Sequence, residues 1–415
     1  MMDLLFYILI GFGLVYSLMT YLAVRREKRS QGRDIRPFEA VPVTVFKPLK
    51  GLDGDLKENL RTFFELDYPR YELIFGVDND RDPAIDIVNE LQNEYPQIEA
   101  HLVINSSTIG YNPKVNNLYN MYPYANYDYL VINDSNVRVN KNYLLSMMRH
   151  ATRPDVGLVT STVMGFGARS IGAIFENMHL NSFIAGNAIL ITRLLKIPVT
   201  IGKSMCFRRE ILEKIGGFRF FSDYLLEDGL LGRTIQKENL KLVITSDYVT
   251  NFNREWSVKH FLNRHLRWAV MRRQLNFGHY FAEVFSNPIF IAALYLVYKQ
   301  TPEALALFGL VNLVKILSDF ALDRLFKTDM KLKQYLLLPA KDLIIGVIWF
   351  LGLFRKTVNW RGNKFILAKD TKIKTRYTGY RLRPAFVFNY LFRLADLTLS
   401  GSRRVKALLS RAYLF

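Results

Sequence analysis

The sequence predicts an α/β domain with a mostly parallel sheet, flanked by apolar helices at both ends of the chain. Short runs rich in β-branched residues alternate with helical stretches between residues 41 and 280, which predicts the sheet and its covering helices. Acidic clusters follow two of these runs, at the place where such sheets bind ligands. Apolar stretches before and after this region predict the flanking helices.

The composition narrows the classes of protein that fit. Half of the 415 residues are hydrophobic, and the formal net charge is +19 with a pI of about 9.8. Such a basic excess suits nucleic acid, anionic lipid or the positive-inside bias of a membrane protein. The single cysteine, Cys206, excludes an intrachain disulfide and a cysteine-based metal site.

The first apolar stretch, residues 4–24, is about 20 residues long and uncharged, enough to span a bilayer as a helix. Basic residues follow it at once, beginning with Arg25 and Arg26. A cleaved signal peptide carries its positive charge before the apolar core, so the order favours a transmembrane anchor at residues 1–24. The positive-inside rule then places a basic linker, residues 25–40, and the domain after it on the cytoplasmic side.

Strands and helices alternate through residues 41–280, which we expect to form the cytoplasmic domain. The expected strands are 43–46, 71–77, 101–104, 129–132, 156–162, 201–208 and 241–244. The expected helices are 55–65, 83–95, 114–121, 210–215, 224–236 and 257–273. Residues 170–195 are weakly amphipathic, and their pattern predicts no particular element.

Three further apolar segments, 284–298, 305–322 and 335–354, lie in an expected membrane region of residues 281–356. Two or three crossings, or one hairpin in the interface, fit their lengths. Charge inside such segments is costly, so Lys341 and Asp342 are expected to pair within a bundle or to mark a bend. The basic and aromatic tail, residues 357–415, suits a membrane interface better than single-stranded nucleic acid, because spanning candidates lie beside it.

Polar clusters near strand ends suit a nucleotide diphosphate. Asp134 can hold a hard divalent cation that neutralises the diphosphate, although acidic and small polar residues after a strand also form turns. Asp78 and Asp80 can accept a hydrogen bond from a nucleobase or ribose, and they fit an ordinary loop equally well. Lys114, near a helix start, can reach a phosphate, with a solvated lysine as the even alternative.

Two later clusters complete the set. Glu227 and Asp228 begin a helical stretch, where a carboxylate can take a proton from a hydroxyl, although the helix dipole alone also favours acid there. Arg264 and Arg267 share one helical face that can clamp a diphosphate, and Trp268 follows them. A solvated basic helix is the alternative for this cluster. The order and spacing of all the clusters together favour a site.

A series of short motifs also carries a family resemblance. They are 48–53 (PLKGLD), 78–86 (DNDRDPAID), 110–117 (GYNPKVNN), 134–139 (DSNVRV), 202–205 (GKSM), 216–218 (GGF), 227–228 (ED), 264–268 (RHLRW) and 358–362 (VNWRG). As a set, the chain resembles the inverting nucleotide-sugar glycosyltransferases, and most closely their ceramide glucosyltransferase branch. Asn136 departs from the pattern, because many relatives of the wider family have a second Asp there.

The resemblance implies a Rossmann-like sugar-nucleotide transferase fold of the GT-A type and the transfer of one sugar with inversion. It implies UDP-glucose as the donor, a lipid hydroxyl such as that of ceramide as the acceptor, and Mg²⁺ or Mn²⁺ held by Asp134. The implied catalytic residues are Asp228 as general base, with Arg264, Arg267 and Trp268 closing over the diphosphate and the acceptor. The implied substrate-binding residues are Lys50, Asp53, Asp78, Asp80, Lys114 and Glu227.

Other functions stay open from the sequence alone. Diacylglycerol or a hopanoid presents a hydroxyl as ceramide does. A processive polysaccharide synthase needs enough spanning helices for a channel, whereas this chain offers about four candidates, and Arg264 stands where polymerising enzymes usually have Gln. A non-catalytic basic membrane-binding protein has no need of carboxylates at strand ends. We expect a UDP-sugar, a membrane lipid and the bilayer as partners, and no nucleic acid.

Overall fold

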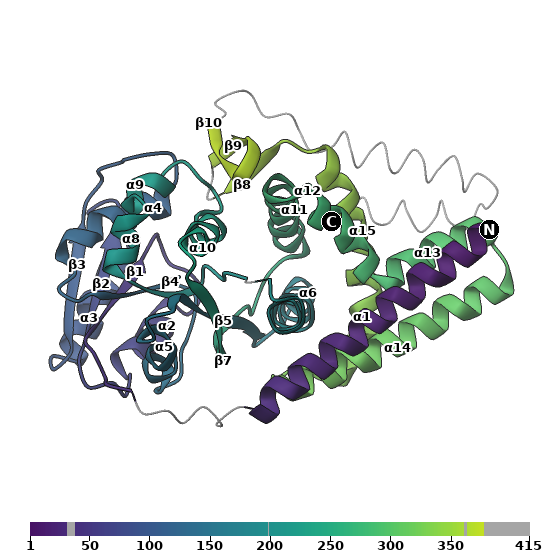
Figure 1. Cartoon of the computed structure of the whole chain (residues 1–415), viewed down its shortest axis with the longest axis horizontal. Helices are drawn as coiled ribbons and strands as arrows, with labels where there is room; N and C mark the ends of the chain where they lie inside the picture. The colour runs from purple at the N-terminus through teal and green to yellow at the C-terminus, as the bar shows by residue number, and fades with distance from the viewer. Residues whose placement is uncertain (31–37, 198, 361–362, 377–415) are drawn as a thin grey trace. The chain divides into compact units, whose positions relative to one another are not determined.

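The structure is a computed structural model that describes residues 1–30, 38–197, 199–360 and 363–376 (Figure 1). These residues form an α/β domain around a seven-stranded sheet, a group of apolar helices and a small three-stranded sheet. The predicted fold class is therefore confirmed, with apolar helices on both sides of the α/β domain in the sequence. Residues 31–37 of the predicted linker and residues 377–415 of the predicted tail lie outside the described residues.

The larger sheet has the strand order β3-β2-β1-β4-β6-β5-β7. Its strands are β1 (Val43–Pro48), β2 (Tyr71–Val77), β3 (Glu99–Ile104), β4 (Tyr129–Asn133), β5 (Val156–Phe166), β6 (Ser204–Arg208) and β7 (Lys241–Phe252). Phe46 of β1 aligns with Ile74 of β2 and Ile132 of β4 in parallel register. The carboxyl ends of these strands therefore meet at one edge, where Asp78 and Asp134 follow directly.

Helices cover both faces of this sheet. They include α2 (Leu56–Phe64), α3 (Ala84–Glu94), α4 (Pro113–Met121), α5 (Tyr143–Ala151), α6 (Ile171–Met178), α8 (Arg209–Lys214) and α10 (Glu227–Lys237). The helices α7 (Gly186–Leu190), α9 (Gly217–Phe221), α11 (Val258–Leu275) and α12 (Phe277–Ala282) pack mainly against other helices. Successive residues of one strand enter different cores: Val45 packs with the cluster under α2, α3 and α5, and Phe46 with the cluster under α4, α8 and α10. This is the period-two pattern of a sheet buried on both sides.

Several elements differ from the predictions. The sheet is mixed, because β6 runs antiparallel to both β4 and β5. The strands β5 and β7 extend well beyond the predicted 156–162 and 241–244, since they pair with each other over almost their whole length. The unassigned stretch 170–195 is helical, with π-helical turns at η2 (His179–Ala185) and η3 (Ile191–Leu195). Buried residues occur on most sides of this helix, which removes the amphipathic period that would predict it.

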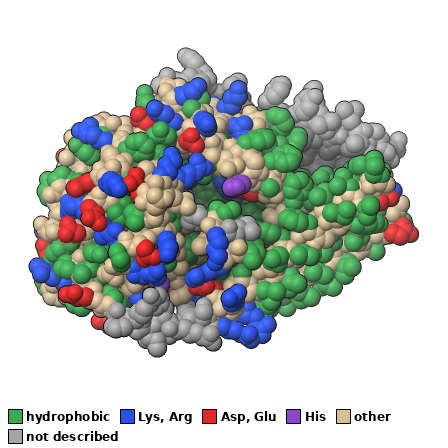
Figure 2. All heavy atoms as spheres, in the orientation of Figure 1, with side chains coloured by type: hydrophobic (Ala, Val, Ile, Leu, Met, Phe, Trp, Pro, Cys, Tyr) green, Lys and Arg blue, Asp and Glu red, His purple; other side chains and the backbone are tan. Residues whose placement is uncertain are grey.

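Three helices lie side by side as an elongated bundle: α1 (Met2–Ser30), α13 (Pro288–Lys299) and α14 (Pro302–Phe326) (Figure 1). Figure 2 shows green apolar side chains along this bundle, whereas charged side chains gather over the α/β domain. Two polar contacts tie its outer end: Asp3 to Lys299 at 2.8 Å, and the hydroxyl oxygens of Tyr7 and Tyr295 at 3.1 Å.

The described residues contain three helical stretches long and apolar enough to cross a membrane, namely Met2–Arg29, Pro302–Phe326 and Leu332–Phe354. A bent pair, Phe277–Ser286 with Pro288–Lys299 at 72°, makes a fourth if it counts as one span. The last stretch joins the short helix η5 (Leu332–Leu337) to α15 (Leu338–Phe354), which packs against α11 and α13. The predicted pair of Lys341 with Asp342 is confirmed: the two side chains meet at 2.7 Å and are buried.

The small antiparallel sheet joins β8 (Thr357–Trp360), β9 (Asn363–Leu367) and β10 (Ile373–Arg376), with a short turn, η6 (Lys369–Thr371), before the last strand. Its apolar side chains pack on Leu225 and on the α11 residues Val270 and Met271. Thr371 accepts hydrogen bonds from the backbone N–H groups of Leu225 and Leu226. The described residues 357–360 and 363–376, in the first part of the predicted tail, therefore support the turn that leads into α10.

Candidate active site

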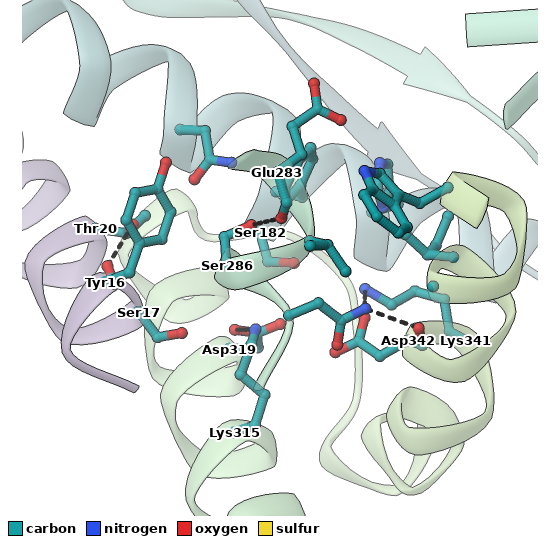
Figure 3. A pocket seen from close by; sticks show the side chains of 18 of the residues that line it. Tyr16, Ser17, Thr20, Ser182, Glu283, Ser286, Lys315, Asp319, Lys341 and Asp342 are labelled. Carbon is teal, nitrogen blue, oxygen red and sulfur yellow. Dashed lines mark hydrogen bonds and ion pairs between the residues drawn. The ribbon is translucent and has the colours of Figure 1, made fainter. Parts of the chain in front are cut away.

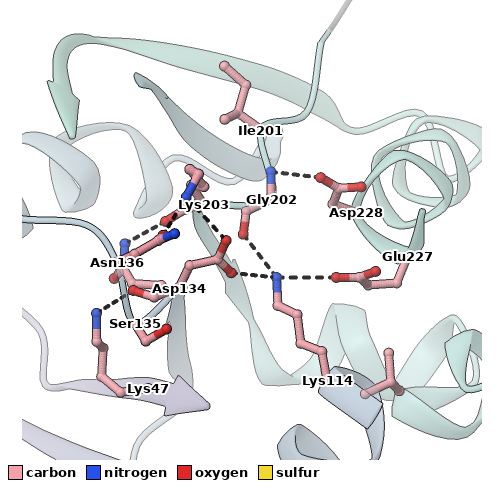
Figure 4. A network of polar contacts seen from close by, with 12 residues as sticks. Lys47, Lys114, Asp134, Ser135, Asn136, Ile201, Gly202, Lys203, Glu227 and Asp228 are labelled. Carbon is pink, nitrogen blue, oxygen red and sulfur yellow. Dashed lines mark hydrogen bonds and ion pairs between the residues drawn. The ribbon is translucent and has the colours of Figure 1, made fainter. Parts of the chain in front are cut away.

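Lys114 joins the elements that meet at the carboxyl edge of the sheet (Figure 4). Its ammonium group lies 2.9 Å from Asp134 Oδ1, which follows β4, and 3.2 Å from Glu227 Oε1, at the start of α10. It also donates a hydrogen bond to the Gly202 carbonyl at 3.2 Å. Burial alone would lower the pKa of Lys114, but the surrounding carboxylates outweigh it and raise the pKa, so the lysine stays charged.

The position of Lys114 follows from the cap of α4. Asn112 precedes the helix, and its side-chain oxygen accepts hydrogen bonds from the backbone N–H groups of Lys114 and Val115. The amide nitrogen of the same side chain donates to the Tyr224 carbonyl at 2.6 Å and to Glu227 Oε2 at 3.1 Å. Asn112 thus holds both Lys114 and Glu227, the carboxylate that Lys114 contacts.

Asp228 is held by backbone groups. Its Oδ2 accepts a hydrogen bond from the Gly202 N–H at 2.8 Å, and its Oδ1 accepts one from the Gly229 N–H at 2.7 Å. Burial and then the like charge of Glu227 raise the pKa of Asp228 to about 6, against the opposing effect of Lys114. The carboxylate is therefore ionised at neutral pH and more basic than an ordinary aspartate.

Two further lysines surround Asp134. Lys203 Nζ lies 3.6 Å from Asp134 Oδ2 and donates to Asn251 Oδ1 at 2.8 Å and to Asn136 Oδ1. Lys47 Nζ donates to the Asp134 carbonyl at 2.6 Å. Burial raises the pKa of Asp134, but the lysines more than reverse this effect and hold it low. Burial first, and then Arg264 and Lys114, lower the pKa of Lys203 to about 8, partly offset by nearby carboxylates.

The predicted nucleotide-side residues lie along the loops after β1 and β2. Ser135, next to Asp134, donates a hydrogen bond to Asp53. Asp78 pairs with Lys50 at 2.7 Å on the surface, and that hydrogen bond is the main cause of the lowered pKa of Asp78. Asp80 is exposed two residues further on. These carboxylates border the site without entering the Lys114 network.

The arginine–tryptophan motif of α11, residues 264–268, is held by a buried carboxylate. Glu176 of α6 lies 3.1 Å from Arg264 Nε and 2.8 Å from His265 Nε2. The Arg264 guanidinium stacks on Trp268 at 4.3 Å and on Trp256 at 5.2 Å from the ring centroids. Arg264 is therefore fixed in place, and its charge acts on Lys203. Arg267, half-buried, follows one turn later on α11.

The sequence reasoning did not single out Glu176, Lys203 or Lys47. Glu176 lies in the stretch that had no predicted structure, and its partners lie 88 and 89 residues away. The one sequence signal for Glu176 was its charge within an apolar stretch, because a charge that becomes buried needs a partner of opposite charge. Lys203 stood inside a recognised motif, but its contact with Asp134 depends on the antiparallel pairing of β6 with β4.

The fold and the site together define a membrane-associated glycosyltransferase. The chain belongs to glycosyl transferase family 21, whose family model matches residues 5–373. Curated relatives include ceramide glucosyltransferase 3 of Caenorhabditis elegans, 27% identical over 385 residues that cover 87% of this chain and 81% of that protein. Ceramide glucosyltransferase 1 of the same organism is 27% identical over 369 residues, which cover 85% and 77% of the two chains.

A shorter match, to the ceramide glucosyltransferase of Candida albicans, is 40% identical over 114 residues, 25% of this chain and 21% of that one. Among solved structures, a mannosyltransferase from Pyrobaculum calidifontis in complex with GDP-Man and Mn²⁺ is similar, with 15% identity and a TM-score of 0.46, over 83% of this chain and 97% of that chain. The predicted family and glycosyltransferase activity are confirmed by the family match, and the chain is a membrane protein.

Proposed function

We propose that this protein transfers one glucose from UDP-glucose to the primary hydroxyl of ceramide, with inversion at the anomeric carbon. The network around Lys114 is the observation that carries the reaction, because one charged side chain links Asp134, on the expected diphosphate side, with Glu227 beside the candidate base Asp228. The curated relatives named ceramide glucosyltransferase support the choice of sugar and acceptor.

Asp228 acts as the general base in this proposal. Its raised pKa, about 6, leaves it ionised at neutral pH while it remains basic enough to accept a proton from a hydroxyl. As the proton moves to Asp228, the lipid oxygen attacks the anomeric carbon and the bond from that carbon to the diphosphate breaks. The product is a β-glucoside and UDP, because a single displacement inverts an α-linked donor.

Lysines and arginines stabilise the negative charge of the departing diphosphate. Lys114 and Lys203 flank Asp134, and Arg267 lies on α11 one turn beyond the anchored Arg264. Trp268 forms the aromatic floor under Arg264 and borders the acceptor. Lys50, Asp53, Asp78, Asp80 and Glu227 bind the donor nucleotide and sugar in this proposal.

Asp134 offers a single carboxylate, already paired with Lys114 and Lys203, so a divalent ion there would be held mainly by the donor. Mg²⁺ commonly takes one or two carboxylates and completes its shell with phosphate oxygens and water. Among the described residues, one set of three acidic or histidine side chains could hold an ion by itself, Glu72, Glu99 and His101, and it lies near the amino ends of β2 and β3. That set lies away from the carboxyl edge of the sheet, where the donor is expected to bind. Asp134 lies at this edge and is therefore the proposed protein ligand for Mg²⁺ or Mn²⁺, which would neutralise the diphosphate when bound.

The catalytic domain lies on the cytoplasmic face in this proposal. The basic residues Arg25, Arg26 and Arg29 stand at the end of α1 that leads into the α/β domain. The positive-inside rule retains such residues in the cytoplasm.

The test is transfer from radiolabelled UDP-glucose to ceramide by the purified full chain in lipid nanodiscs. The wild type should form glucosylceramide with a single hexose, identified by mass spectrometry. Asp228→Asn should retain UDP affinity and lose turnover by at least about 10²-fold, because the amide cannot accept the proton. Asp128→Asn, at an exposed carboxylate, is the matched control and should behave as the wild type.

Each alternative has its own product in this assay. Transfer to diacylglycerol or a hopanoid but not to ceramide would refute the acceptor, and a ladder of hexose additions would identify a processive synthase. An unchanged rate in Asp228→Asn would refute the assignment of the base while leaving the sugar and the acceptor in place.

A further inference from the structure

Lys203 is held at the candidate active site by neutral partners (Figure 4). Its side chain is buried, and its ammonium group donates hydrogen bonds to Asn136 Oδ1 and, at 2.8 Å, to Asn251 Oδ1. Asp134 Oδ2 lies 3.6 Å from the same nitrogen, an ion-pair distance beyond the range of a hydrogen bond. Amide oxygens orient an ammonium group without cancelling its charge, so Lys203 remains a source of positive charge beside Asp134.

The buried lysines among the apolar helices are paired in a different way. In the polar cavity that these helices line, Lys315 meets Asp319, and Lys341 meets Asp342 at 2.7 Å (Figure 3). Each of these two ammonium groups has a carboxylate of its own at hydrogen-bond distance, as buried charges usually do. The two amides that hold Lys203 do not neutralise it, and its charge is therefore available to an anion that enters the site.

A row of buried amides sets the direction of Asn251. Its side-chain nitrogen donates to Asn253 Oδ1, and Asn253 Nδ2 donates to Asn177 Oδ1 at 2.8 Å. Each of the three side chains is at most 2% exposed. Because the nitrogens of this row point away from Lys203, the oxygen of Asn251 faces the ammonium group, and hydrogen bonds in such a chain strengthen one another. Asn251 is therefore a positioning residue for Lys203, supported from β7 and α6.

The ammonium group of Lys203 is placed for a phosphate oxygen. It has three donors, and the amides of Asn136 and Asn251 take two of them, which leaves the third for an anion beside Asp134. A divalent ion on Asp134 would lie about 2 Å from a carboxylate oxygen and so within a few ångströms of this ammonium group. Like charges repel, so Lys203 disfavours a metal ion on the protein alone and favours the negative diphosphate.

We propose that Lys203 is a built-in counter-cation for the donor diphosphate, which takes over part of the charge neutralisation that a divalent ion supplies. This inference rests on the proposed function and adds a source of donor affinity that does not need metal. The lysine and the metal ion then compensate for each other. Loss of either one weakens donor binding moderately, whereas loss of both removes most of it.

The test is the affinity for UDP of the full chain in lipid nanodiscs, measured by titration calorimetry with saturating Mg²⁺ and with excess EDTA. In the wild type, EDTA should raise the Kd for UDP by about tenfold or less, because Lys203 still pairs with the diphosphate. Lys203→Met keeps an unbranched apolar side chain and removes the charge. In this variant EDTA should raise the Kd by about 10²-fold or more, the loss of a charge-assisted hydrogen bond that the metal no longer offsets.

A second variant leaves the lysine in place. Asn251→Leu removes the oxygen that orients Lys203, so the effect of EDTA should grow several-fold, and the double variant with Lys203→Met should show no further growth. A general loss of structure would instead weaken UDP binding equally with and without metal. Lys214→Met, at a mostly exposed lysine of α8, is the matched control and should respond to EDTA as the wild type does.

The outcomes separate this inference from the proposed function. Equal effects of EDTA on the wild type and on Lys203→Met would refute the inference, and so would loss of all measurable UDP binding when EDTA is added to the wild type. Either result leaves transfer to ceramide in place. If Lys203→Met does not fold, the comparison of Asn251→Leu with the wild type decides in the same way. If the wild type binds no UDP even with Mg²⁺, the proposed function itself fails.

Discussion

At the scale of single residues, Asp228 lies between one like charge and one opposite charge. Glu227 raises its pKa and Lys114 lowers it, with burial as the largest cause of its net rise to about 6. Since only the ionised carboxylate can accept a proton, kcat/KM should fall about tenfold per pH unit below pH 6 and level off above it. Initial rates from pH 4.5 to 8 give this profile directly.

Substitutions of Glu227 and Lys114 should shift the acidic side of this pH profile in opposite directions. Glu227→Gln removes the repulsion, so the pKa of Asp228 falls and activity persists at lower pH. Lys114→Met removes the attraction, so the acidic side of the profile shifts above pH 6 while overall activity falls. A shift of both variants in the same direction would contradict this electrostatic account, and Asp128→Asn should leave the profile unchanged.

At the scale of the elements, the turn before β6 places the Gly202 N–H against Asp228, the proposed base. A Cβ at Gly202 would lie 2.2 Å from Asp228 Oδ2, far inside van der Waals contact. Gly202→Ala should therefore displace the carboxylate and lower kcat by about 10²-fold or more, since a small misplacement of a catalytic group is this costly. Gly54→Ala, where a Cβ meets nothing within 4 Å, is the control and should keep full activity in the transfer assay.

The helices α6 and α11 are joined by ion pairs of Glu176, whose carboxylate is fully buried. Glu176→Gln should lower the free energy of unfolding by about 3–5 kcal/mol, because it leaves the buried Arg264 guanidinium without its counter-charge. A double variant with Arg264→Gln should regain part of that stability and none of the activity. Glu210→Gln, at an exposed carboxylate that pairs with Arg208, should change stability little. Thermal unfolding in nanodiscs measures all three, and equal losses in the single and double variants would argue against the pairing.

The elements and contacts differ in how far local sequence predicts them. The strand that ends before Asp78 and the helix that begins at Glu227 follow from short patterns of apolar, acidic and turn residues. The direction of β6 does not, because side-chain alternation is the same in parallel and antiparallel strands. The contact of Lys114 with Glu227 joins residues 113 positions apart, so only the folded sheet reveals that the predicted phosphate ligand also pairs with an acidic residue of the predicted base cluster.

At the scale of the whole molecule, the edge of the sheet that carries the proposed site and the apolar helices share α11. This helix carries Arg264 and Trp268 toward the site, packs along α15, and supports the small sheet that follows α15. The loop into α10 is held by that same sheet through Thr371. The proposed site, where a soluble donor would meet a lipid, is therefore built from both parts of the fold.

The Asp3–Lys299 contact has a practical consequence for locating the enzyme in a cell. It holds the first residues at the end of the bundle away from the α/β domain (Figure 1). An epitope fused ahead of Met1 should therefore emerge in the organelle lumen or outside the cell, while the sugar nucleotide is used on the opposite face. In sealed microsomes, protease should spare this epitope until detergent is added, and intact vesicles should consume external UDP-glucose. Loss of the epitope without detergent would mean that the chain is inserted the other way round.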